Sequence, residues 1–115
     1  MATEFDDAQL EAITGGDREF EREVLEEYLH SAPSDLQKLR AAVTAGDAKA
    51  TGAAAHAIKG ASATIGAKGF AAIALLLEQS GKQAQMDEAP AQFARLEAEY
   101  AELAVALRAR IEKAA

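Results

Sequence analysis

The sequence of 115 residues fits one domain that can bury its own hydrophobic core, so residues 1–115 are expected to form a single domain. It has no cysteine, which excludes disulfides and thiolate metal sites, and no apolar run long enough to span a membrane. The net charge of −7 argues against general nucleic-acid binding. Because the acidic N-terminus lacks the features of a signal peptide, the cytoplasm is the expected compartment.

Charge is unevenly distributed along the chain. Residues 1–37 carry 11 acids and 2 bases, residues 38–82 carry 2 acids and 6 bases, and residues 83–115 carry 6 acids and 4 bases. The basic middle segment would suit an acidic partner or an anionic group, although charge alone leaves random scatter equally open.

A short helix is expected first. Asp6, with Gln9 three residues later, resembles a capping box at the start of a helix. Phe5 is placed to pack on Leu10 as a hydrophobic staple, which would fix the direction in which the chain enters the helix. The two glycines at 15–16 end the helix after about two turns.

A longer helix is predicted over roughly 17–45, beginning at Asp17. Its apolar residues recur every three or four positions up to Val43 and continue past Pro33. Because proline lacks an amide hydrogen and clashes with the preceding turn, we expect a kink or break near residues 29–33. Since the apolar stripe survives the proline, we interpret the segment as one bent helix. The stripe consists of Phe20, Val24, Leu25, Tyr28, Leu29, Ala32, Leu36, Leu39 and Val43.

Two more helices are expected on either side of Gly66. Asp47 is placed to cap a helix that runs to about Ile65, where Gly66 ends it. A dense apolar run from Phe70 to Leu77 follows, and its length favours a largely buried helix over a strand. The apolar face of the helix before Gly66 is predicted to consist of Ala54, Ile58, Ala61 and Ile65.

A last long helix is predicted to begin near Pro90, because proline is well suited to a first helical turn. No segment alternates with the period of a strand, and the connections are short. We therefore predict an all-α fold, an antiparallel up-and-down four-helix bundle with a short N-terminal helix. The expected seam of the last helix consists of Phe93, Leu96, Tyr100, Leu103, Leu107 and Ile111.

His56 stands out because it lies about 160° around the helix axis from Ile58 and so points away from the predicted apolar face. Most of its neighbours on that outward face are small. Two of them are glycines, Gly52 and Gly60, and each weakens a helix interior by about 1 kcal/mol relative to alanine. A bulky partner that must approach the imidazole ring closely would explain them. The neighbours are Gly52, Ala53, Lys59, Gly60 and Ala63.

An accessible imidazole at such a position is suited to phosphoryl chemistry. Neutral imidazole is nucleophilic near neutral pH and can form covalent intermediates. A phosphoryl group on the ring of His56 would be anionic, and Lys59 would offset part of its charge. From the spacing alone, an ordinary exposed histidine in an alanine-rich helix remains the simpler alternative.

The residues around His56 resemble a known signature. Histidine phosphotransfer (HPt) domains carry the pattern H-x-[LI]-K-G-x-[SA], which is similar to HAIKGAS at residues 56–62. Their apolar-Gly step at the end of the same helix is similar to IGA at residues 65–67, and their usual Leu-Glu in the next helix is similar to residues 77–78. The resemblance covers roughly residues 17–110.

The resemblance implies a role for each matched residue. His56 would be the phospho-acceptor, Lys59 would stabilise the phosphoryl group, and Gly60 would let a receiver domain approach. We expect the docking surface around them to include five further residues, with the two lysines adding positive charge at its rim. Ser62, Gly66 and Ala67 would be structural. The further docking residues are Gly52, Ala53, Ala63, Lys68 and Lys82.

The resemblance also implies a phosphoryl carrier without kinase activity in a multistep two-component phosphorelay. Its partners would be receiver domains of response regulators and of a hybrid histidine kinase, with neither nucleic acid nor membrane involved. No cofactor is expected on this chain, and the magnesium ion would belong to the receiver domain. We expect a monomer, because a four-helix chain can close its own core.

Two other functions stay open at this point. Phospho-accepting domains of chemotaxis-type histidine kinases share the same motif, and they differ in taking the phosphoryl group from ATP on a separate catalytic domain. A non-catalytic helical adaptor with an inert histidine is the second alternative. A metal site is not expected, because Glu27 and His30 supply only half of the ligand pattern of a bundle di-iron centre.

Overall fold

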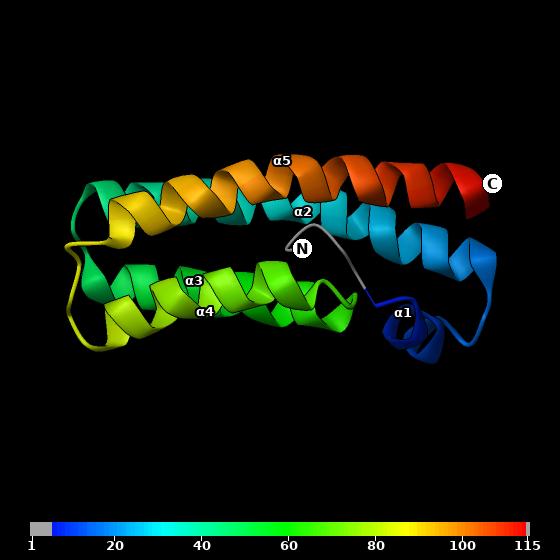
Figure 1. Ribbon diagram of the computed structural model, residues 1–115, viewed down its shortest axis with the longest axis horizontal. Coiled ribbons are helices and arrows are strands. Elements are labelled where there is room, and N and C mark those ends of the chain that lie inside the picture. The colour runs from blue at the N-terminus through cyan, green and yellow to red at the C-terminus, as the bar shows by residue number, and fades with distance from the viewer. Residues whose placement is uncertain (1–5, 115) are drawn as a thin grey trace.

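The computed structural model describes residues 6–114, and every regular element among them is a helix (Figure 1). The all-α class predicted from the sequence is therefore confirmed. Within this part of the chain, no helix is both long and apolar enough to cross a membrane. The helices are α1 (Asp7–Thr14), α2 (Arg18–Thr44), α3 (Ala48–Thr64), α4 (Lys68–Lys82) and α5 (Ala89–Ala114).

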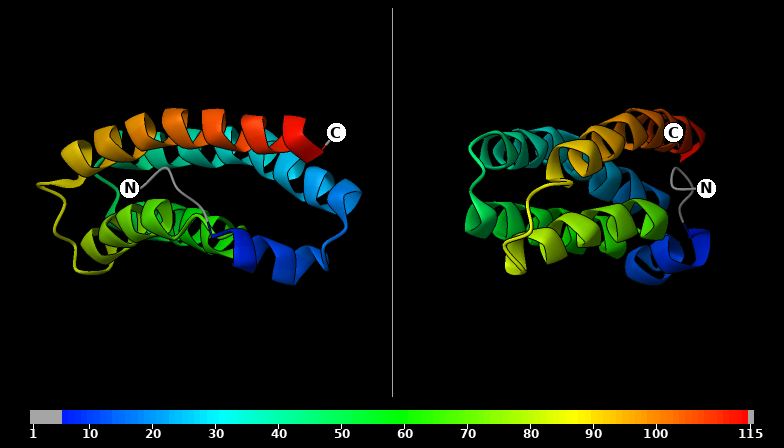
Figure 2. Two further views of the ribbon diagram at one scale, coloured as in Figure 1. Left: turned by 45° about the vertical axis from the view of Figure 1, so that its right-hand side comes forward. Right: turned by 60° about the vertical axis from the view of Figure 1, so that its left-hand side comes forward.

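The four long helices lie side by side along the longest dimension of the molecule (Figures 1 and 2). α2 packs on α3 and on α5, and α4 also packs on α3 and on α5, so each long helix has two long neighbours. Successive long helices run in opposite directions in Figure 1. The short α1 contacts α2 and α3 at one end of this arrangement.

Aspartate side chains begin three of the helices, as the sequence predicts. Asp6, Asp17 and Asp47 each accept a hydrogen bond from a backbone N–H in the first turn, at 2.9 to 3.1 Å. Replacing such a cap by alanine typically costs about 1 kcal/mol of stability. The predicted contact between Phe5 and Leu10 lies outside the described residues, because Phe5 does.

Gly66 follows the end of α3 and also anchors α1. Its φ of 86° lies in the left-handed region that glycine adopts without strain. A β-carbon at this position would lie 2.7 Å from the carbonyl oxygen of Asp6, so no larger residue fits. The Gly66 carbonyl oxygen accepts the N–H of Asp6 at 2.8 Å, which ties the start of α1 to the end of α3.

α2 is one continuous helix that contains Pro33, so the single helix predicted for this segment is confirmed and no break occurs. Most of its predicted stripe is buried or half-buried, but the placement of Phe20 is wrong, because its side chain is 45% exposed. The neighbouring Glu21 turns inward instead. It does so because Arg110 of α5 binds its carboxylate there.

Two predictions about apolar faces are wrong in detail. In α3, Ala61 is exposed, and Ser62 lies inward with its Oγ 2.8 Å from the hydroxyl oxygen of Tyr28. In α4, Leu75 and Leu76 are exposed, because α4 packs on α3 and α5 through other residues. Alanine-rich and leucine-rich runs carry little information about which side of a helix is covered. The largest fully buried apolar side chains are Leu10, Leu25, Leu39, Phe70, Leu77, Leu96, Leu103 and Leu107.

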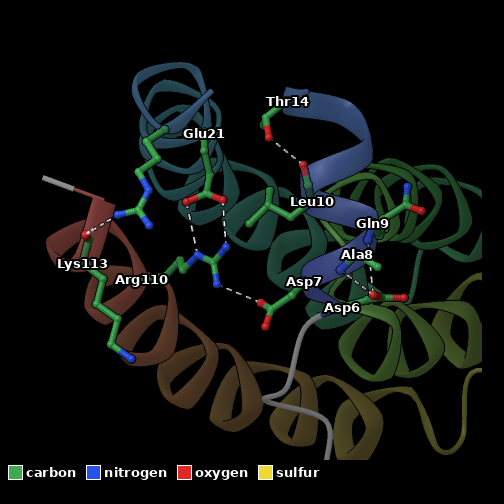
Figure 3. A network of polar contacts seen from close by, with 10 residues as sticks. Asp6, Asp7, Ala8, Gln9, Leu10, Thr14, Glu21, Arg110 and Lys113 are labelled. Atoms are coloured by element: carbon green, nitrogen blue, oxygen red, sulfur yellow. Dashed lines mark hydrogen bonds and ion pairs between the residues drawn. The ribbon is translucent and has the colours of Figure 1, made fainter. Parts of the chain in front are cut away.

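α1 is held in place by apolar and polar contacts at the end of the bundle (Figure 3). Leu10 of α1 is fully buried. Arg110 of α5 donates to both carboxylate oxygens of Glu21, at 3.0 and 3.1 Å, and to a carboxylate oxygen of Asp7 at 3.0 Å. One guanidinium therefore joins α1, α2 and α5, as the dashed lines in Figure 3 show.

Candidate functional site

His56 projects from the outer face of α3. Its side chain is 67% exposed, so the outward placement predicted from helix geometry is confirmed. The ring is nevertheless held on one side, because its Nδ1 atom lies 3.0 Å from Oε2 of Glu78 on α4. The ring is thus reachable by a partner and anchored by the neighbouring helix at the same time.

Glu78 is the central residue of the site, and sequence reasoning gave it no role there. Its side chain is only 2% exposed, because other side chains of the site cover it. The signal that could have found it is the spacing to Lys82, since an acid four residues before a lysine lies on the same helix face. What the sequence cannot show is that α4 brings this face up against His56.

Three groups converge on the carboxylate of Glu78. The Nζ atom of Lys59 lies 2.7 Å from Oε1, and the Nζ atom of Lys82 lies 3.0 Å from Oε2, the oxygen that also contacts His56. The Lys59 ammonium, followed by that of Lys82, lowers the pKa of Glu78 to about 2, and the bond to His56 acts in the same direction against the effect of burial. Glu78 is therefore ionised at neutral pH.

The contact with Glu78 selects one tautomer of the His56 ring. An ionised carboxylate can only accept hydrogen bonds, so the ring nitrogen beside it must carry a hydrogen. In the neutral ring this places the hydrogen on Nδ1 and leaves the lone pair on Nε2. The arrangement therefore presents Nε2 as the nucleophilic atom of an exposed imidazole.

The lysine and the glycine of the motif have different surroundings. Lys59 is 30% exposed and lies on the Glu78 carboxylate, within the same cluster as His56. Gly60 is exposed, and a β-carbon there would meet no atom within 4 Å. The packing of the fold thus gives no reason for glycine at position 60.

The expected outward placement of Gly52 is wrong. Gly52 is buried, and a β-carbon on it would lie 3.6 Å from the carbonyl oxygen of Glu78 and 3.7 Å from the amide nitrogen of Lys82. The glycine therefore faces α4 rather than solvent. The prediction failed because α4 packs against this part of α3, and the alanine-rich sequence of α3 does not reveal that contact.

An open groove of about 730 Å³ lies beside His56, between α3 and α4. Ala53 is exposed and lines this groove, as do Lys49 of α3 and Lys82 of α4, which each bring a positive charge to it. A small residue and two lysines in the lining suit a partner that carries negative charge.

Two of the predicted docking residues lie outside this groove. Ala63 is exposed near the end of α3. Lys68, at the start of α4, forms an ion pair with Asp6, whose Oδ2 lies 3.1 Å from its Nζ, and this contact lowers the pKa of Asp6. Lys68 therefore supports the start of α1. Among residues 6–114, no group of three or more histidine and acidic side chains is arranged to hold a metal ion.

The chain is similar to known proteins in sequence and in structure. Residues 23–106 match the family described as Hpt domain, which is well over half of the chain. The structure is similar to the crystal structure of histidine-containing phosphotransfer protein B (HptB) from Pseudomonas aeruginosa PAO1, with a TM-score of 0.89. The two sequences are 28% identical, and the match covers 95% of each chain. No curated protein matches the sequence at a significant level.

Proposed function

The chain belongs to the histidine phosphotransfer (Hpt) domain family, and we propose that it carries a phosphoryl group on His56 between the aspartates of two receiver domains. Histidine phosphotransfer in a phosphorelay is the function that the family and the similarity to HptB support. Hpt proteins act there as phosphoryl carriers rather than kinases, and they interact with receiver domains. The observation that carries the proposal is the exposed His56 ring, anchored through Nδ1 by the buried Glu78.

The proposed reaction starts with the lone pair on Nε2 of His56. It attacks the phosphorus of a receiver's aspartyl phosphate, and the N–P bond forms while the P–O bond to the aspartate breaks. The aspartate carboxylate leaves with the bonding electron pair. Because Nδ1 keeps its hydrogen, the phosphorylated ring gains positive charge, which the Glu78 carboxylate offsets at 3.0 Å. Attack by a second receiver's aspartate reverses these steps.

Lys59 and Gly60 support this reaction in different ways. Phosphoryl transfer depends chiefly on positioning and on stabilisation of negative charge. Lys59 supplies an ammonium within the cluster that contains His56, and Gly60 keeps the space beside the ring open. We place the receiver on the groove next to His56, where Ala53 gives it room and Lys82 meets its negative charge. Its contact would extend beyond the groove to the exposed Ala63 near the end of α3.

Several finer features belong to the proposal. The magnesium ion that the reaction needs is placed on the receiver domain, with no cofactor on this chain. The four long helices form an antiparallel up-and-down bundle that closes its own core, so the protein works as a monomer. The cytoplasm is the compartment in which it meets its partners, which are receiver domains of response regulators and of a hybrid histidine kinase.

The test compares two phosphoryl donors on the wild-type protein and on His56→Gln. One donor is a receiver domain labelled on its aspartate, and the other is a histidine kinase core supplied with labelled ATP. We expect acid-labile phosphate on the wild type from the phospho-receiver and none on His56→Gln, because glutamine has no nucleophilic ring nitrogen. Equal labelling of the two proteins would disprove the assignment of His56, and labelling only by the kinase core would make this a kinase's phospho-accepting domain.

A further inference from the structure

The backbones of α3 and α4 approach each other closely where two glycines meet. A β-carbon on Gly81 of α4 would lie 2.5 Å from the amide nitrogen of Gly52, 2.8 Å from its Cα and 2.6 Å from the carbonyl oxygen of Ala48. All three atoms belong to the backbone or to Cα of α3, so no side chain can rotate away to make room. Any residue larger than glycine at position 81 must therefore push the two helices apart.

The contact lies next to the His56 site. His56 is four residues after Gly52 on α3, and Glu78 is three residues before Gly81 on α4, so each lies about one helical turn from the glycine contact. Gly52 itself packs on the stretch of α4 backbone from Glu78 to Lys82, where a β-carbon would be 3.6 to 3.8 Å from the nearest atoms. The separation of the helices at the glycines thus also sets their separation at His56 and Glu78.

The bond between His56 and Glu78 tolerates little displacement. Hydrogen bonds from ring nitrogens to oxygen lie within a few tenths of an ångström of 2.9 Å, and the observed distance is 3.0 Å. Glutamate is short, and its carboxylate is also held by Lys59 and Lys82. An outward shift of α4 of the size of a methyl group would therefore remove the carboxylate from the ring.

We propose that the contact between Gly52 and Gly81 sets the distance at which Glu78 holds the His56 ring, which makes Gly81 a positioning residue for phosphoryl transfer. The consequence of the glycine contact for phosphoryl transfer rests on the proposed function, whereas its effect on the His56 ring does not. Glycine weakens the interior of a helix, and the close contact of the two backbones is the compensating reason for its presence at position 81.

The first arm of the test measures the ring directly. The ¹⁵N chemical shifts of the His56 ring distinguish the tautomer with hydrogen on Nδ1 from the one with hydrogen on Nε2. We expect Gly81→Ala to lose the preference for hydrogen on Nδ1. The matched control is Gly52→Ala, whose β-carbon fits at ordinary contact distance, and it is expected to keep that preference. A folded Gly81→Ala protein with the wild-type tautomer would overturn the proposal.

The second arm shows whether Gly81 acts through Glu78. Glu78→Met has a side chain of similar length but removes the hydrogen-bond acceptor, so Gly81→Ala is expected to change nothing further in the ring when added to it. An equal change in the ring with and without Glu78 would overturn the proposal. If Gly81→Ala does not fold, Gly52→Val takes its place, since its methyl groups press on the same α4 backbone from the other side.

The third arm measures transfer from a labelled phospho-receiver. We expect Gly81→Ala to accept the phosphoryl group about tenfold more slowly, because small misplacements of reacting groups have effects of this size or larger. A normal rate together with a changed tautomer would overturn the role of Gly81 in transfer. Failure of the wild type to accept any phosphoryl group would instead contradict the proposed function, and the tautomer measurements would still decide the geometric claim.

Discussion

The Glu78 carboxylate links the stability of the fold to pH. The pKa of Glu78 is lowered from 4.5 to about 2 by Lys59, Lys82 and His56. A carboxylate whose pKa is lower in the folded protein stabilises the fold at a pH above its unfolded value. That contribution is lost as the pH falls from about 4.5 through about 2.

This linkage predicts how Glu78→Gln behaves. The unfolding free energy of the wild type should exceed that of the variant at about pH 7. The difference should shrink at about pH 3, where the carboxylate of the unfolded chain is already protonated while that of the folded protein is still mostly ionised. Urea unfolding of both proteins at each pH measures this difference in unfolding free energy. Titrating groups that do not contact Glu78 are common to the two proteins, so their effects cancel. A difference that stays constant with pH would contradict the lowered pKa of Glu78.

Gly60 gives a second prediction at the scale of single residues. Because a β-carbon there meets nothing within 4 Å, Gly60→Gln should fold normally and gain about 0.5 to 1 kcal/mol from better helix propensity. The longer side chain would occupy the space beside His56, so transfer from a phospho-receiver should slow about tenfold or more. Unfolding measurements and transfer rates on the same sample separate the two effects. Unchanged transfer would contradict the close approach of a partner.

The residues of the site were predictable from the sequence to different degrees. His56 was predictable because its angle relative to Ile58 is a property of one helix, and the surrounding motif is local. Glu78 was not assigned a role because its importance arises only when α4 packs against α3. Gly52 was misplaced for the same reason, since a glycine in an alanine-rich helix does not reveal which neighbour approaches it.

The starts and ends of the helices were the most predictable features at the scale of elements. Aspartate caps and glycine stops act within a few residues, so Asp17, Asp47 and Gly66 mark real boundaries. The faces of the helices were less predictable. Glu21 is the clearest example, because a carboxylate is expected at the surface unless a distant arginine is known to meet it.

Arg110 gives a prediction about how the elements are held together. Arg110→Met keeps an unbranched side chain but leaves Glu21, which is 7% exposed, without its partner. We expect the unfolding free energy to fall by about 2 to 3 kcal/mol, because a mostly buried charge loses two hydrogen bonds. Hydrogen exchange of α1 and α2 amides should rise as well, since the guanidinium joins these helices to α5.

Asp7 provides the matched control for Arg110. Asp7→Ala removes only the hydrogen bond between Arg110 and the Asp7 carboxylate, which is 66% exposed. The unfolding free energy is therefore expected to fall by about 0.5 kcal/mol or less. Chemical unfolding of the two variants side by side tests the comparison. Equal losses in the two variants would show that the burial of Glu21 contributes nothing.

At the scale of the whole molecule, the fold sorts the charge that the sequence distributes unevenly. Within residues 6–37, most of the acids lie in α1 and in the first part of α2, while α3 and α4 contain four lysines and one acid. Because α3 and α4 lie together as one layer in Figure 1, the side that carries His56 is the less negative side. This arrangement favours the approach of an acidic partner to that side. The basic middle segment of the chain becomes one side of the fold because α3 and α4 are neighbours in sequence and in space.

The grouping of Lys59 and Lys82 on Glu78 has a consequence for what happens when a phosphoryl group arrives. Both ammonium groups already lie beside anionic oxygens and have already given up part of their water. A phosphoryl group on His56 would offer them oxygens of the same kind only a short distance away. Charge compensation would then require the exchange of one anion for another rather than the recruitment of distant side chains, which keeps the reorganisation of the site small in both directions of transfer.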